Sequence, residues 1–174
     1  VKPVRARSLY QRLSPRPVLS AVAAEPAASP PPPSRPRLSV LVAEDNEINA
    51  LLATRTLERF GCAAVWAPDG SRALAAIEAG FAGDGPCFDL VLLDIRMPGM
   101  DGLAVARAVR SREKEGPGRA PLPLVAVSAN VSDGDRAAAL AAGMDDCLAK
   151  PLERAALQRW LDRVAASHPL SRSA

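Results

Sequence analysis

Histidine is almost absent from this sequence. The 174 residues include one histidine, His168, in a polar stretch close to the carboxyl end. A lone histidine cannot build a histidine-rich metal site, and a polar tail is a poor place to order a Ser-His-Asp triad. The sequence therefore argues against both kinds of site.

Cysteine is also scarce, and long apolar runs are missing. The three cysteines form no Cys-x-x-Cys pair, and their odd number favours reduced thiols in a cytosol. No run approaches the roughly 18 apolar residues that a membrane-spanning helix needs. A short apolar run at 18–24 weakly resembles a signal peptide, but Pro15 and Pro17 interrupt the approach to it. We therefore expect a cytoplasmic segment without membrane contact.

Nucleotide-binding loops are missing too. The sequence has neither a Gly-x-Gly-x-x-Gly loop in register nor a Gly-Lys pair. Its composition nevertheless suits a sizeable core, because 48% of the residues are hydrophobic and 24% are charged, with nearly balanced signs. Neither a wholly disordered chain nor a membrane protein fits these values. We expect one folded domain and a spare segment.

The positive charge is concentrated at one end of the chain. The net charge of +3 invites a nucleic-acid interpretation, but residues 1–37 hold nine prolines and seven basic residues against one acidic residue. Residues 38–174 hold 15 basic against 18 acidic residues. We predict a basic Pro/Ala/Ser-rich linker at 1–37, a folded domain at 38–167 and a tail at 168–174. The folded part is not expected to bind nucleic acid. Because the chain begins with Val1, we expect it to be a piece of a longer protein.

Short apolar runs alternate with helical periods from Leu38 onward. Continuous apolar runs predict strands buried on both faces, at 39–43, 63–67, 90–93, 124–127 and 146–149. Amphipathic spacing predicts helices at 47–60, 71–79, 103–115, 133–142 and 153–166. Asn46 is a suitable amino-terminal cap of the first helix, and Gly61 a suitable carboxyl-terminal cap. The alternation predicts an α/β fold, a doubly wound parallel sheet with helices on both faces.

Polar residues stand at the carboxyl ends of four predicted strands, where such sheets carry their ligand sites. They are Glu44, Asp45, Asp94, Ser128 and Lys150. Three crowded carboxylates favour a hard divalent cation such as Mg²⁺, and a carboxylate beside that cation stays ionised and nucleophilic. A lysine and a hydroxyl nearby would bind an incoming anion. Together these groups predict a site for phosphoryl transfer.

Four stretches of this sequence resemble one known family. They read LVAEDN at 41–46, LLDIRMPGMDG at 92–102, VSA at 127–129 and KP at 150–151. Over residues 38 to about 166 the chain resembles the receiver domain of two-component response regulators. Its Glu-Asp-Asn-x-x-Asn start is similar to that of receivers fused to hybrid histidine kinases. The resemblance implies a flavodoxin-like sheet of five parallel strands in the order 2-1-3-4-5.

The resemblance also implies roles for the residues at the strand ends. Asp94 would accept a phosphoryl group from a phosphohistidine, and the domain would catalyse its own phosphorylation and dephosphorylation. Glu44, Asp45 and Asp94 would hold Mg²⁺ together with the backbone carbonyl of Arg96. The implied partner is a histidine kinase or a histidine phosphotransfer protein, and the oligomeric state stays open.

Two departures from the family pattern concern the switch and the lifetime of the phosphoryl group. The resemblance implies that Ser128 and Lys150 contact the phosphoryl oxygens, and that Ser128 and position 147 form the switch. Position 147 is commonly Tyr or Phe in the family, whereas this chain has Cys147, which we interpret as a small buried hydrophobe. Arg96 and Asn130 stand where the family flanks the hydrolytic water, so we expect them to tune dephosphorylation.

Several alternatives remain at this point. We expect the carboxyl-terminal receiver of a hybrid sensor histidine kinase, with no kinase domain in this segment. A stand-alone single-domain response regulator is one alternative, and a pseudo-receiver that only binds proteins is another. A haloacid-dehalogenase-like phosphatase also forms an aspartyl phosphate, but it needs a second aspartate where Arg96 stands. Trp66 and Trp160 are interpreted as core or interface residues.

Overall fold

The computed structural model describes residues 37–115 and 120–167. The linker predicted at 1–37 lies outside the described residues except for its last residue, and the tail at 168–174 with His168 lies outside them entirely. Those two predictions therefore stay predictions. Within the described residues, none of the helices is both long enough and apolar enough to span a membrane.

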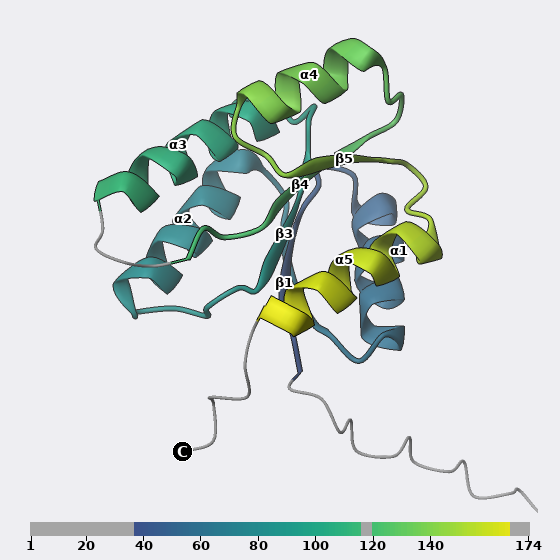
Figure 1. Ribbon diagram of the computed structural model, residues 1–174, viewed down its shortest axis with the longest axis horizontal. Helices are drawn as coiled ribbons and strands as arrows, with labels where there is room; N and C mark the ends of the chain where they lie inside the picture. The colour runs from purple at the N-terminus through teal and green to yellow at the C-terminus, as the bar shows by residue number, and fades with distance from the viewer. Residues whose placement is uncertain (1–36, 116–119, 168–174) are drawn as a thin grey trace, which may run out of the picture. The chain divides into compact units, whose positions relative to one another are not determined.

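Five parallel strands form one sheet in the order β2-β1-β3-β4-β5 (Figure 1). The strands are β1 Ser39–Ala43, β2 Ala63–Ala67, β3 Leu90–Asp94, β4 Leu124–Ser128 and β5 Asp146–Ala149. All residues of β3 and β4 are buried, as their continuous apolar sequences predict. The expected fold class and strand order are both confirmed.

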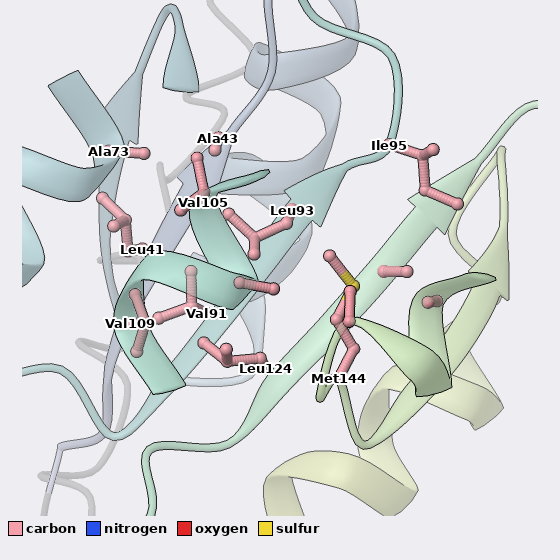
Figure 2. Close-up of a cluster of buried hydrophobic side chains, with 14 of the residues drawn as sticks. Leu41, Ala43, Ala73, Val91, Leu93, Ile95, Val105, Val109, Leu124 and Met144 are labelled. Carbon is pink, nitrogen blue, oxygen red and sulfur yellow. The ribbon is translucent and has the colours of Figure 1, made fainter. Parts of the chain in front are cut away.

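Five helices cover the two faces of the sheet. They are α1 Glu47–Arg59, α2 Gly70–Ala82, α3 Gly102–Glu115, α4 Asp133–Ala141 and α5 Arg154–Ser167. Figure 1 shows α1 and α5 on one face and α2, α3 and α4 on the other. Each face has its own core, because side chains along a strand alternate between the faces. Leu41 and Leu93 join the cluster under α2, α3 and α4, drawn in Figure 2, whereas Val42 and Leu92 join the cluster under α1 and α5.

The boundaries differ from the predicted ones by a few residues. β3 and β4 each continue one residue further than predicted, because Asp94 stays in the parallel ladder opposite Val127 and Ser128 stays opposite Ala149. The predicted cap Asn46 is confirmed, since its side chain accepts hydrogen bonds from the backbone of the first helical turn. At the other end of α1 the cap residue is Phe60, and Gly61 follows it with a φ of 80°, the left-handed conformation in which glycine ends helices.

Candidate functional site

Three carboxylates meet at the carboxyl edge of the sheet. Glu44 and Asp45 follow β1, and Asp94 is the last residue of β3, the strand next to β1. One carboxylate oxygen from each lies within 4.8 Å of the others. Glu44 and Asp94 are only 5% and 6% exposed, whereas Asp45 is open to solvent. The predicted convergence of these side chains is present, with one acidic group at the rim and two below it.

Lys150 joins this cluster from the end of β5. Its Nζ lies 2.6 Å from Asp94 Oδ2 and 2.5 Å from Glu44 Oε2. Burial acts to lower the pKa of Lys150, but the hydrogen bonds and negative charges of Asp94 and Glu44 outweigh it and raise this pKa above its ordinary value. Lys150 therefore carries its positive charge throughout the physiological pH range. The Lys150–Pro151 peptide bond is cis.

The backbone after β3 also contacts Asp94, the predicted phosphoryl acceptor. The amide of Arg96 donates a hydrogen bond of 3.0 Å to Asp94 Oδ1, while the Arg96 side chain is exposed. The sequence did not predict this contact of the Arg96 amide. It predicted roles for the backbone carbonyl and the side chain of Arg96. Asp94 thus has one carboxylate oxygen on a backbone amide and the other on Lys150. Both contacts are charge-assisted hydrogen bonds to the ionised carboxylate.

Ser128 is buried at the end of β4, but its hydroxyl is turned into the following loop. Its Oγ donates to the carbonyl of Asn130 over 3.0 Å, and it accepts from the Asn130 amide over 3.3 Å. A hydroxyl held in this way must rotate before it can donate to a phosphoryl oxygen. The Asn130 side chain itself is exposed, and the predicted roles of both residues in phosphoryl chemistry stay predictions.

Two residues that the sequence interpretation left out of the site hold Glu44. Asn49, in the first turn of α1, donates from Nδ2 to Glu44 Oε1 over 3.0 Å. Trp66, on β2, donates from Nε1 to the backbone carbonyl of Glu44 over 2.8 Å. The second asparagine of the Glu-Asp-Asn-x-x-Asn start was a signal for Asn49. No local signal points to Trp66, because its contact depends on the pairing of two strands.

Cys147 lies in the core beneath α4, as the interpretation of a small buried hydrophobe predicts. Burial raises the pKa of its thiol, and the charges of Asp135 and Asp146 raise it further against the opposing charge of Arg136. The thiolate is the reactive form of cysteine, so this environment keeps Cys147 poorly reactive at neutral pH.

Thiol alkylation of the native chain is expected to modify Cys87 first. Cys87 is half-buried, whereas Cys62 and Cys147 are buried and burial raises both of their pKa values. We expect the two buried thiols to react at least about tenfold more slowly with iodoacetamide, since access and thiolate fraction both limit them. Mass spectrometry of a time course measures the order, and denatured protein is the control. Early modification of Cys147 would instead indicate a reactive, redox-competent thiol.

The parallel fold and the acidic site define a signalling receiver domain. The chain belongs to the family described as response regulator receiver domain, whose model matches residues 40–162.

Curated relatives of this chain include sensor proteins and a hybrid histidine kinase. ArcB, the aerobic respiration control sensor protein of Escherichia coli K12, is 42% identical over 128 residues, which are 74% of this chain and 15% of ArcB. The sensor protein GacS of Pseudomonas syringae is 38% identical over 152 residues, or 87% of this chain and 16% of GacS. A hybrid signal transduction histidine kinase of Dictyostelium discoideum is 39% identical over 134 residues, 75% of this chain and 7% of the kinase. The chain thus spans only a small part of these relatives.

Solved receiver domains have the same fold. The receiver domain of Ssk1 from Saccharomyces cerevisiae, co-crystallised with the histidine phosphotransfer protein Ypd1, is similar with a TM-score of 0.68 at 25% identity, over 80% of this chain and 97% of that chain. The receiver of the histidine kinase CKI1 from Arabidopsis thaliana, in complex with Mg²⁺ and BeF₃⁻, is similar with a TM-score of 0.62 at 28% identity, over 74% and 90% of the two chains. This chain is a receiver domain of the kind that serves phosphorelays.

Proposed function

We propose that Asp94 is the phosphoacceptor of this receiver, taking its phosphoryl group from a phosphohistidine with the help of Mg²⁺. The observation that carries the proposal is the environment of Asp94: 6% exposed, in contact with the ammonium of Lys150, and grouped with two further carboxylates. A buried carboxylate in direct contact with an ammonium group, beside two further carboxylates, is a suitable nucleophile for phosphoryl transfer.

The residues at the site fit a divalent cation. Three carboxylates have oxygens within 4.8 Å of one another, and the ammonium group of Lys150 contacts two of them, Glu44 and Asp94, which leaves an excess of negative charge. Mg²⁺ takes oxygen ligands and keeps several waters, which suits a cluster with one member open to solvent. We propose Glu44, Asp45 and Asp94 as the residues that hold it, with the Arg96 carbonyl. When bound, the ion would neutralise charge on the transferred group.

The contacts of Asp94 indicate how the phosphoryl group would be transferred to it. An oxygen of Asp94 forms a bond to phosphorus while the bond from phosphorus to the donor's imidazole nitrogen breaks, and the electron pair stays on that nitrogen. Lys150 keeps its proton and moves from the Asp94 carboxylate to an oxygen of the phosphoryl group. Ser128 gives up its bond to the Asn130 carbonyl and donates to another phosphoryl oxygen, which moves the loop before α4. That loop movement would change how partners bind.

Beryllofluoride, a mimic of the phosphoryl group, tests whether the site is active. Adding it with Mg²⁺ is expected to shift the amide resonances of Asp94, Ser128 and Lys150, because the mimic would join Asp94 and draw the other two toward it. The control adds beryllofluoride with EDTA, which removes the metal and should leave the spectrum unchanged. An unchanged spectrum in the presence of Mg²⁺ would support the alternative of a pseudo-receiver.

The exposed side of α1 indicates a protein donor. Ile48, Leu51 and Leu52 are 70%, 55% and 61% exposed, and α1 begins directly after Asp45 and the cap Asn46. Apolar side chains grouped beside a functional site favour an interaction surface. We propose that a histidine phosphotransfer protein or histidine kinase docks there, which is consistent with the yeast receiver that was co-crystallised with such a phosphotransfer protein.

Leu52→Asp is expected to slow transfer from a phosphorylated histidine phosphotransfer protein by about tenfold or more, because a charge would be buried at the centre of the contact. Labelling by acetyl phosphate, which needs no docking surface, should not change. Leu140→Asp is the matched control, since Leu140 is 48% exposed on α4. Equal slowing in both variants, or none in Leu52→Asp, would contradict docking on α1. Initial rates of transfer measure the effect.

The similarity to much longer relatives supports a place for this chain within a larger protein. In the hybrid histidine kinase and the sensor proteins named above, the matched region is only 7% to 16% of the length. We propose that this chain is the receiver part of a hybrid sensor histidine kinase working in the cytoplasm. A stand-alone response regulator is the second candidate.

A further inference from the structure

Trp66 is an edge-strand residue that contacts the site from outside. It lies on β2, in register with Val42 of β1, and side chains of neighbouring parallel strands in register point to the same face. Trp66 is 40% exposed, and its Nε1–H donates a hydrogen bond of 2.8 Å to the carbonyl oxygen of Glu44. Besides the apolar surface that it buries, Trp66 therefore makes a polar contact with the backbone at the site.

β2 holds both backbone polar groups of Glu44. The Glu44 amide donates to the Ala67 carbonyl over 3.1 Å, and the Glu44 carbonyl accepts from Trp66. The Glu44 side chain is held separately, by Asn49 on one oxygen and by Lys150 on the other. Of these contacts, the bond from Trp66 acts at the point where the chain leaves β1 and turns toward α1.

The position of this contact matters for the next residue. The carbonyl of Glu44 and the amide of Asp45 belong to one planar peptide unit, so a bond that fixes the carbonyl also fixes the plane from which Asp45 projects. Asp45 is the exposed member of the three-carboxylate cluster. Mg²⁺ demands near-octahedral ligand geometry, so a small rotation of that plane would weaken binding.

We propose that Trp66 is a positioning residue for the Mg²⁺ site, acting through the Glu44–Asp45 peptide. The inference rests on the proposed function, because it requires the three carboxylates to hold the ion. Removing residues that orient metal ligands typically lowers metal affinity by about 10- to 100-fold. Trp66 orients the backbone rather than a ligating group, so we expect a smaller loss, of about three- to tenfold.

The experiment compares two tryptophan variants of the full chain. Trp66→Phe keeps an aromatic ring at the sheet edge but removes the N–H donor. Trp160→Phe is the matched control. The indole of Trp160 donates a hydrogen bond of 3.2 Å to Asp146, which begins β5. Asp146 therefore lies at the amino ends of the strands, whereas the site lies at their carboxyl ends. Each protein is titrated with Mg²⁺ alone, and the amide shift of Asp45 reports the dissociation constant. Urea unfolding followed by circular dichroism checks that both variants are folded.

Trp66→Phe is expected to raise the Mg²⁺ dissociation constant about three- to tenfold, with Trp160→Phe within about twofold of the unaltered chain. Trp66 is the remaining tryptophan in Trp160→Phe. During the Mg²⁺ titration of that variant, the fluorescence of Trp66 should change at the same Mg²⁺ concentration as the amide shift of Asp45. Equal affinity in both variants would overturn the inference and leave the proposed metal site intact. A lack of Mg²⁺ binding by the unaltered chain would overturn the proposed metal site and the inference with it.

Discussion

Asp94→Asn is expected to reduce phosphoryl transfer from a phosphohistidine donor to background. The amide that replaces the carboxylate has no negative oxygen to attack phosphorus, while its size and shape are nearly unchanged. Its neighbours keep their other contacts, because Lys150 still meets Glu44 and the Arg96 amide still has an oxygen to bond. Folding should therefore survive, and the loss should be one of chemistry.

The measurement is the transfer of labelled phosphate from a phosphorylated histidine phosphotransfer protein in the presence of Mg²⁺. Asp101→Asn is the matched control, because Asp101 lies in the loop that follows Asp94 and accepts a 2.7 Å hydrogen bond from the Ala104 amide, which asparagine also accepts. We expect this control to be labelled like the unaltered chain. Label retained by Asp94→Asn would place the acceptor on another residue and refute the proposed function.

Gly102→Ala is expected to destabilise the fold and displace the acceptor at the same time. Gly102 is the first residue of α3, and a Cβ placed there would lie 2.2 Å from the carbonyl oxygen of Asp94 and 3.0 Å from its carbonyl carbon. Backbone atoms cannot move aside as a flexible side chain does, so either α3 or the end of β3 must shift. Overpacking of this kind costs about 3 kcal/mol of unfolding free energy.

The position of the strain makes its effect on function specific. The crowded carbonyl belongs to Asp94 itself, so the shift would move the acceptor relative to Lys150 and weaken their 2.6 Å contact. Labelling by acetyl phosphate should fall along with stability, even at temperatures where the variant remains folded.

Gly134→Ala is the matched control for this variant. Gly134 lies near the start of α4, where a Cβ would meet nothing closer than the Ser132 hydroxyl at 3.6 Å. Alanine there should leave stability unchanged or raise it by about 0.5–1 kcal/mol, because glycine is a poor helix former. Urea unfolding measures both variants. Equal stability of Gly102→Ala and Gly134→Ala would show that the close approach of α3 to β3 is not a constraint.

Part of this receiver follows from patterns that are local along the chain. Continuous apolar runs and amphipathic periods predicted all five strands and all five helices within the described residues. Glu44, Asp45, Asp94 and Lys150 could be brought together in advance, because the carboxyl ends of parallel strands share one edge of the sheet. Each of these patterns is formed by residues close together in the sequence, so it can be recognised before the fold is known.

Other features depend on where side chains from separate elements meet. The rotation of the Ser128 hydroxyl toward Asn130 depends on the shape of one loop, and the indole of Trp66 reaches Glu44 because β2 pairs with β1. The burial of Cys147 was expected, but its place under α4 and the charges of Asp135 and Asp146 beside it were not.

The order of the elements, the parallel sheet and the set of charged groups at its carboxyl edge can all be predicted from local composition and spacing. The orientation of those groups cannot, because it depends on hydrogen bonds of about 3 Å between residues far apart in the chain. Gly102 combines both cases: the motif contains it, but only the close approach of α3 to the Asp94 carbonyl explains why a side chain is excluded there.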